Sequence, residues 1–117
     1  MGIDTYAALT ERLSPEQIVE RLQIKCGATN IRTRHMRSPD HWVFEFELGR
    51  SRFFALEAFL NGLAANDFPE LGAEIHTLLS MERGSDSGSL IHNVAAGCEG
   101  WFRLTDSVDW TILSVSL

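Results

Sequence analysis

The segment Trp42–Leu48 constrains the fold more than any other part of this chain. Aromatic and aliphatic side chains occupy every second position, and Glu45 and Glu47 lie between them. A period of two is typical of a strand with one face in an apolar core and the other in water. The sequence therefore predicts a β-strand here, in a sheet with one buried face.

A long helix is predicted over Pro15–Cys26. Ser14 and Gln17 have the spacing of a capping box, and a proline stands at the first helical position. Gly27 can adopt the left-handed conformation that ends helices. A further short helix of one or two turns is expected at the N-terminus, capped by Asp4 or Thr5 and running through Tyr6, Ala8 and Leu9. Two helices would then precede the strands.

The segment Arg52–Leu60 fits two structures. As a strand, it would form a hairpin with Trp42–Leu48 in which Phe54 pairs with Phe46 and Leu56 with Phe44, so that apolar residues meet. As a helix, its alanine and leucine content is favourable, and an apolar stripe would continue to Leu63. The hairpin register favours the strand.

The remaining segments complete an α+β domain. Alternation and turn residues predict strands at Asn30–Met36, Glu74–Met81, Trp101–Leu104 and Trp110–Leu117, and a loop at Asn61–Gly72. A helix is predicted after a cap at Asp86 or Ser87, with Leu90, Ile91, Val94 and Cys98 on its apolar face and Gly100 at its end. Helices, strands, one further helix and two strands follow one another. This order predicts one α+β domain over residues 1–117, with a mainly antiparallel sheet of about five to six strands.

Composition limits the classes of protein to consider. The chain has 117 residues, of which 44% are apolar and 22% charged, which suits one compact domain. It contains neither an apolar run of membrane-spanning length nor the pattern of a secretory signal. We therefore expect a cytoplasmic protein that does not enter a membrane.

The charge is acidic and unevenly distributed. Residues up to Arg52 include eight basic and seven acidic side chains, whereas the residues from Phe53 onward include two basic and nine acidic ones. An acidic second half argues against binding to phosphate backbones and suits either solubility or a basic protein partner.

From the spacing of the cysteines and histidines we expect no catalytic group, no metal site and no cofactor. Cys26 and Cys98 do not form a CxxC pair, and each is expected to be a reduced, buried thiol. No two histidines have the spacing of a metal pair on a helix. His35 and His41 flank a turn with Asp40 and could meet around a metal, but ordinary histidines are the simpler interpretation.

The segment from Gly84 to Ser89 is the alternative site of chemistry. Its candidate ligand residues are Gly84, Ser85, Asp86 and Ser87, which precede a helix and could present main-chain N–H groups to an anion. With a nearby histidine, His76 or His92, the loop would serve a small-ligand-binding protein or an enzyme. It lacks the lysine of a phosphate-binding loop, and helix capping alone explains its composition.

Half of the basic residues fall within one strand-turn-strand region. They are Arg32, Arg34, Arg37, Arg50 and Arg52. Such a cluster could bind nucleic acid or an acidic partner. The net negative charge and the opposing Glu45 and Glu47 favour neutralisation across the sheet instead.

The order of several segments resembles the small acidic proteins of bacterial prophages and toxin-immunity loci. Thr5–Leu9 and Leu13–Glu20 are similar to their opening, and Thr77–Met81, the Gly84-Ser85 loop, Ser89–Cys98 and Gly100–Phe102 follow in their order. Glu99 stands where a glycine is usual in those proteins, and an acidic cluster after it is lacking. The resemblance implies a non-enzymatic binding protein and transfers no functional residue. Small acidic type III secretion chaperones are a second likeness, by size and charge.

The leading interpretation is a small acidic protein that binds another protein as an immunity factor or inhibitor. The chain has more large aromatic residues than one buried sheet face needs, so some of them are expected on the second face. These residues are Phe53, Phe59, Phe68, Trp101 and Trp110. The candidate contact residues for the partner are Trp101, Trp110, Phe59, Asp106 and Asp109. The alternative is that the helices cover both faces of the sheet or that a homodimer covers the second face.

Overall fold

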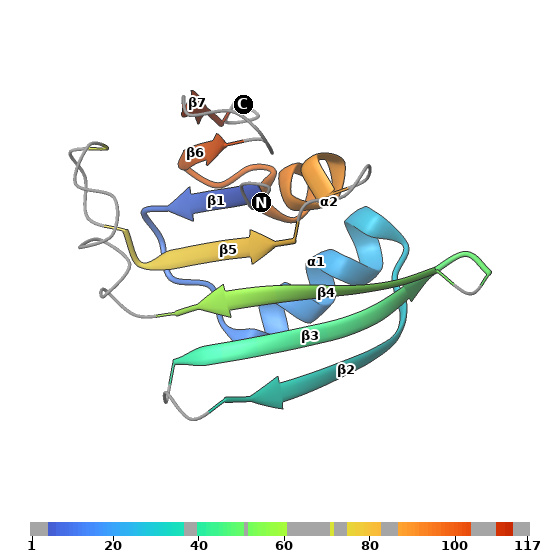
Figure 1. The fold of residues 1–117 in the computed structure, drawn as a ribbon. Helices are drawn as coiled ribbons and strands as arrows, with labels where there is room; N and C mark the ends of the chain where they lie inside the picture. Colours follow the sequence, from blue (N-terminus) through green and yellow to red (C-terminus); the bar gives the residue numbers. More distant parts are fainter. Residues whose placement is uncertain are drawn as a thin grey trace.

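A computed structural model of the chain describes residues 5–36, 40–50, 52–60, 71, 75–82, 87–103 and 110–113. Within these residues, seven strands form one sheet in the order β2-β3-β4-β5-β1-β6-β7, and each neighbouring pair is antiparallel. Both helices of the described residues pack on the same face of this sheet (Figure 1). The α+β class is confirmed, with one strand more than the sequence predicted.

The helix α1 (Pro15–Cys26) begins and ends where the sequence predicted. The Gln17 main-chain N–H donates to the Ser14 hydroxyl, and the Ser14 N–H donates to the Gln17 side chain. Gly27 is left-handed, with φ of 70°. Ile18 and Leu22 face the sheet and are fully buried, so α1 is held by its caps and by one apolar stripe.

The strands β3 (His41–Leu48) and β4 (Arg52–Phe59) form the predicted hairpin. Phe46 lies opposite Phe54 and Phe44 opposite Leu56, in a register without a break. The strand interpretation of this segment is therefore confirmed and the helix interpretation is wrong. β2 (Thr29–His35), the strand predicted at Asn30–Met36, pairs with the other side of β3 and forms an edge of the sheet.

The segment Thr5–Leu9 is the strand β1, so the prediction of a short helix there is wrong. β1 lies in the interior of the sheet, between β5 (Thr77–Met81) and β6 (Gly100–Arg103). Ala7, Ala8 and Leu9 are all buried because both faces of this strand are covered. Burial on both faces removes the alternation that identifies a strand in sequence, and the helix propensity of alanine then misleads.

The helix α2 (Ser87–Ala95) ends before the predicted Gly100. Gly97 is left-handed, with φ of 85°, and turns the chain away from the helix. Gly100 instead begins β6, which pairs with β1 and with the short edge strand β7 (Thr111–Ile112). Most of the predicted Asn61–Gly72 loop and the end of the predicted last strand lie outside the described residues.

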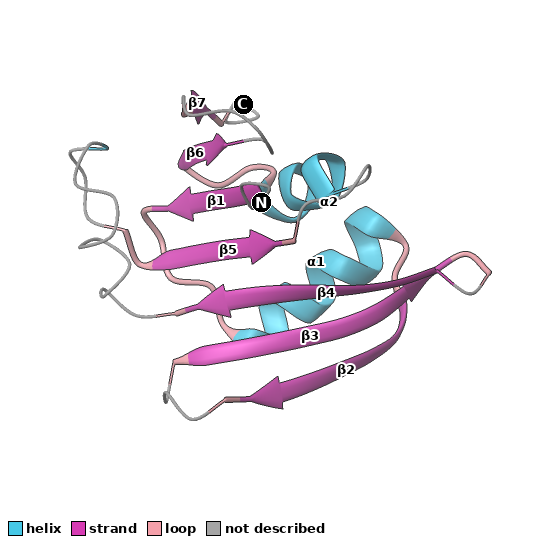
Figure 2. Cartoon of the chain, viewed as in Figure 1, coloured by secondary structure: helices cyan, strands magenta, loops and turns pink. Residues whose placement is uncertain are grey.

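Apolar side chains cover the two faces of the sheet unequally. The main core lies between the sheet and the helices, which Figure 2 shows together on one side of the strands. On the opposite face a smaller cluster lies over β5, β1 and β6; it consists of Ala8, Ile75 and Leu78 with Tyr6, Phe59, Leu71, Trp101 and Trp110 packed against them. The same face of β2, β3 and β4 carries mainly charged and exposed residues.

Candidate functional site

The part of the second sheet face that the other described residues leave uncovered forms the open-face groove. It lies over β2, β3 and β4 and reaches the residue after β5. The residues that line it are Asn30, Ile31, Arg32, Arg34, Met36, Val43, Glu45, Phe46, Glu47, Phe53, Phe54, Ala55, Glu57, Ser80, Met81 and Glu82. Residues of β3 and β4 alternate between the core and this groove, so the strand pattern itself places the carboxylates here.

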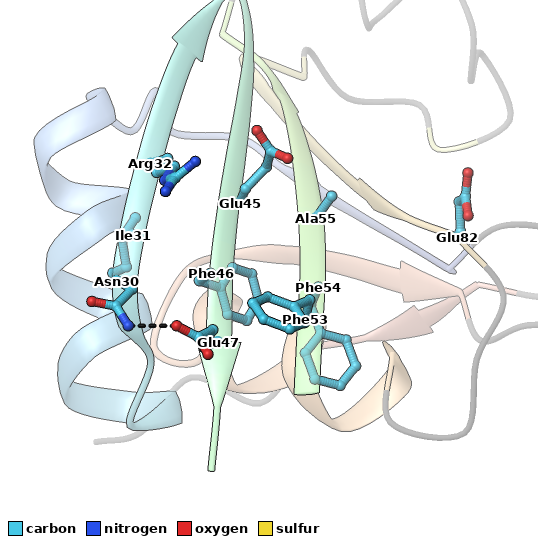
Figure 3. Close-up of a pocket in the computed structure, with 10 residues that line it drawn as sticks. All are labelled: Asn30, Ile31, Arg32, Glu45, Phe46, Glu47, Phe53, Phe54, Ala55 and Glu82. Atoms are coloured by element: carbon cyan, nitrogen blue, oxygen red, sulfur yellow. Dashed lines mark hydrogen bonds between the residues drawn. The ribbon is translucent and has the colours of Figure 1, made fainter. Parts of the chain in front are cut away.

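The groove consists of two adjoining hollows of about 890 and 480 Å³. Both are lined by Phe53, Phe54, Ala55 and Glu82, so they meet at the first half of β4. Figure 3 shows Glu82 standing apart from the strands, across from Ala55. Hollows of roughly 300–1,000 Å³ are of the size that binds ligands or side chains of a partner.

The groove is more acidic than basic. Four carboxylates line it, from Glu45, Glu47, Glu57 and Glu82, against the guanidinium groups of Arg32 and Arg34. The Arg34 Nε lies 3.0 Å from Glu45 Oε1, and Arg32 lies opposite Glu45 in the register of β2 and β3. Part of the arginine cluster is therefore neutralised across the sheet, as the sequence analysis favoured.

The negative charges of the remaining carboxylates are less well neutralised by neighbouring groups. Glu47 accepts a hydrogen bond from the Asn30 side chain, and Glu57 Oε1 lies 3.3 Å from His41 Nε2. Glu82 is exposed, and no cationic side chain among the described residues pairs with it. The β4 side of the groove therefore presents negative charge to an incoming group.

Phe53 is the large apolar side chain that this groove exposes most. Its exposed fraction is 72%, whereas the neighbouring Phe54 turns inward and stacks on Phe46 with ring centroids 5.8 Å apart. Arg52 covers the Phe54 ring, with its guanidinium carbon 5.4 Å from the centroid. The hairpin therefore shields one phenylalanine and leaves the other in water.

The predicted aromatic contact residues lie in the smaller cluster beside the groove. Trp101, Trp110 and Phe59 are half-buried there. The Arg103 guanidinium lies 5.0 Å from the Trp110 ring centroid, and His41 stacks on Phe59 at 4.3 Å. Asp106 and Asp109 lie outside the described residues. The expectation that some aromatic residues reach the second face is confirmed, with Phe53 as its most exposed member.

Of the four candidate residues of the glycine-serine loop, only Ser87 lies within the described residues. Gly84, Ser85 and Asp86 lie outside them, and Ser87 is the first residue of α2. His92 is exposed and meets the edge of the Phe102 ring. His35 stacks on Trp42. Across the described part of the chain, no three His, Cys, Asp or Glu side chains gather as metal ligands would.

The two cysteines are free thiols. Burial raises the pKa of Cys26, and burial together with the neighbouring Glu11 raises the pKa of Cys98 to about 11. Both thiols are therefore protonated at neutral pH. A protonated thiol is a poor nucleophile and a poor metal ligand.

The groove was not predicted from the sequence, although the strand pattern contains a signal for it. The hairpin register that pairs Phe46 with Phe54 also places Phe53, Glu45 and Glu57 on the opposite face. The register does not show where β5 ends. The end of β5 determines how much of that face is accessible to a partner.

No family model, curated protein or solved structure matches this chain. None of the helices in the described segments is long and apolar enough to cross a bilayer.

Proposed function

We propose that this chain is a non-enzymatic protein-binding module of the immunity or inhibitor type, and that it binds its partner through the open-face groove. The observation that carries the proposal is the exposure of Phe53 among the carboxylates of Glu45, Glu57 and Glu82. An apolar centre within a charged rim is the usual arrangement of a protein-binding surface.

The apolar part would supply affinity. Phe53 leaves most of its ring in water in the unbound protein. Complete burial of a phenylalanine side chain is worth about 1.5–3 kcal/mol. Ala55 beside it is small and exposed, so a partner side chain can lie against both residues without a steric conflict.

The charged part would select the partner. Four carboxylates against two guanidinium groups favour a partner with lysine or arginine around an apolar contact. The acidic second half of the chain extends the same preference. Long-range attraction of this kind raises the association rate and weakens as salt is added.

The proposal is tested by comparing two substitutions at equally exposed apolar residues. Phe53 and Ile24 are both 72% exposed, but Ile24 lies on α1 and not in the groove. Wild-type protein, Phe53→Asp and Ile24→Asp are immobilised, and a lysate of the source cells is passed over each. We expect a protein retained by the wild type and by Ile24→Asp, lost from Phe53→Asp, and released as salt increases. Equal retention on all three, or retention of nothing, would contradict the proposal.

A further inference from the structure

The main-chain groups of β4 alternate between the two sides of the strand. In an antiparallel sheet the N–H and C=O groups of one residue point to the same neighbouring strand, and those of the next residue to the other. The Leu60 N–H donates to the main-chain oxygen of Asp40, the residue that precedes β3, so the groups of Leu60 point to the β3 side. Because the β3–β4 register has no break, the groups of Phe54 and Leu56 also point to β3. Those of Phe53 and Ala55 point to the opposite side.

On that opposite side the neighbouring strand ends early. β5 pairs with Glu57, Ala58 and Phe59 of β4, and the pairing stops there. The same register would place Ala55 opposite Glu82, which follows the last residue of β5. Among the described residues, no strand therefore pairs with Phe53 and Ala55 along this edge. Their N–H and C=O groups point away from β3, to the side on which Glu82 lines the groove.

Within the described residues, the β4 edge at Phe53 and Ala55 has neither a bulge nor a charged side chain of its own that would discourage further pairing. The outer strand β2 shows such features: its register is broken between Thr29 and Arg32, Asn30 has a positive φ of 50°, and Arg32 is exposed. Breaks and charges of this kind discourage the addition of another strand. The segment of β4 at Phe53 and Ala55 is regular and apolar instead.

We propose that the partner contributes an extended basic segment, which pairs as an added strand with the edge of β4 at Phe53–Ala55. Main-chain hydrogen bonds give such a segment its affinity, and alternate side chains give it specificity. Its lysine or arginine side chains would share the open face with Glu57 and Glu82, and an apolar residue would cover Phe53. This inference rests on the proposed function, because it assigns the mode of binding at the same groove.

The test uses random displayed peptides of about ten residues, the length of a long strand. Peptides are selected on the wild-type protein, and amide hydrogen exchange is measured with and without the most enriched one. We expect enriched sequences in which basic and apolar residues alternate. Exchange at the Phe53 and Ala55 amides is expected to slow at least about tenfold, because both become hydrogen-bonded. The Phe54 and Leu56 amides, which point to β3, serve as internal controls.

A matched pair of variants tests the same donor. Ala55→Pro removes the one N–H group of Ala55 that faces the groove, and proline is tolerated where a strand N–H faces solvent. Ala55→Val keeps the N–H. We expect peptide affinity to fall at least about tenfold in Ala55→Pro and to persist in Ala55→Val, with amide spectra confirming that both fold.

The outcomes separate the inference from the proposed function. Peptides that bind the groove and leave the Phe53 and Ala55 amides unprotected would overturn strand addition but not the groove as a binding surface. Failure to enrich any peptide, or enrichment of peptides that bind elsewhere, would contradict the inference, and the lysate experiment would then decide the proposed function alone. Protection that rises with protein concentration and without peptide would identify a second copy of this chain as the occupant and overturn the inference.

Discussion

Arg21 of α1 donates a hydrogen bond of 2.8 Å from its Nη1 to the main-chain oxygen of Ala96, the residue that follows α2. The same nitrogen donates at 2.9 Å to the Val94 oxygen. The last carbonyl groups of a helix have no partner within it, and a cation near them is favourable. One side chain of α1 therefore caps α2 and ties the two helices together.

Replacing Arg21 with methionine should destabilise the protein by about 2 kcal/mol, the order expected for hydrogen bonds from a charged donor. Methionine keeps much of the aliphatic stem, so the loss reports the hydrogen bonds more than the packing. The measurement is urea unfolding followed by tryptophan fluorescence. Gln23→Ala, at an exposed position of the same helix, is the control and should be near neutral. An equal loss in both variants would contradict the assignment.

Thr77 should not tolerate valine. Its hydroxyl is buried, accepts a hydrogen bond of 2.9 Å from the Leu13 N–H, and donates one of 2.8 Å to the Glu11 oxygen. Thr77→Val keeps the shape but leaves both main-chain groups without this partner, which we expect to cost about 2–4 kcal/mol of unfolding free energy. Denaturant unfolding measures it. Thr77→Ser keeps the hydroxyl and should lose clearly less; equal losses would show that the methyl group, not the hydroxyl, matters.

Gly100 should not tolerate any larger residue, because a side chain there would clash with the neighbouring strand. A Cβ atom there would lie 2.2 Å from the main-chain oxygen of Ala8 in the neighbouring strand. We expect Gly100→Ala to cost about 3 kcal/mol or more, since main-chain atoms of a central strand cannot move aside cheaply. Thermal unfolding, or the yield of folded protein, measures the effect.

Gly97→Ala is the matched control for Gly100→Ala. A Cβ at Gly97 would have no atom within 4 Å, but the residue is left-handed, with φ of 85°. The expected cost is therefore only about 1–2 kcal/mol of backbone strain. If Gly97→Ala were the more damaging of the two, the close approach of β6 to β1 would not be the constraint.

The parts of the fold that the sequence predicted are those specified by local interactions. Ser14, Gln17 and Gly27 define the ends of α1 within a few residues of chain. The β3–β4 register follows from apolar pairing across a short turn. β1 was missed because its neighbours β5 and β6 come from far along the chain and bury both of its faces. Local sequence carries no trace of that burial.

The candidate site was predictable only in part, for the same reason. Alternation in β3 and β4 assigns Glu45, Glu57 and Phe53 to the face away from the core. The partial cover of that face by Trp101 and Trp110 depends on the distant β6 and β7. The open edge at Ala55 depends on where β5 stops pairing. These contacts between segments far apart in the sequence determine which exposed aromatic residue a partner can reach.

Cys98 should be almost inert to alkylation in the folded protein. Its pKa is raised from 9.0 to about 11, first by burial and then by the neighbouring Glu11. At pH 8 the thiolate fraction is then about 100-fold lower than in the unfolded chain. Because a thiolate of higher pKa is also more nucleophilic, the reaction rate should fall by at least about tenfold. The measurement is the rate of iodoacetamide reaction in Cys26→Ser, in buffer and in denaturant. Equal rates would show that Cys98 is accessible and ordinary.

The same shift predicts how stability changes in alkaline solution. The folded state holds the Cys98 proton more tightly than the unfolded state, so this contribution to stability is fully present below pH 9. It is lost as the pH rises from 9.0 towards about 11. Cys98→Ala lacks the titrating thiol and should lose less stability than the parent across this interval, with urea unfolding at each pH as the measurement. Parallel losses in the two proteins would mean that other groups govern the alkaline limit of this fold.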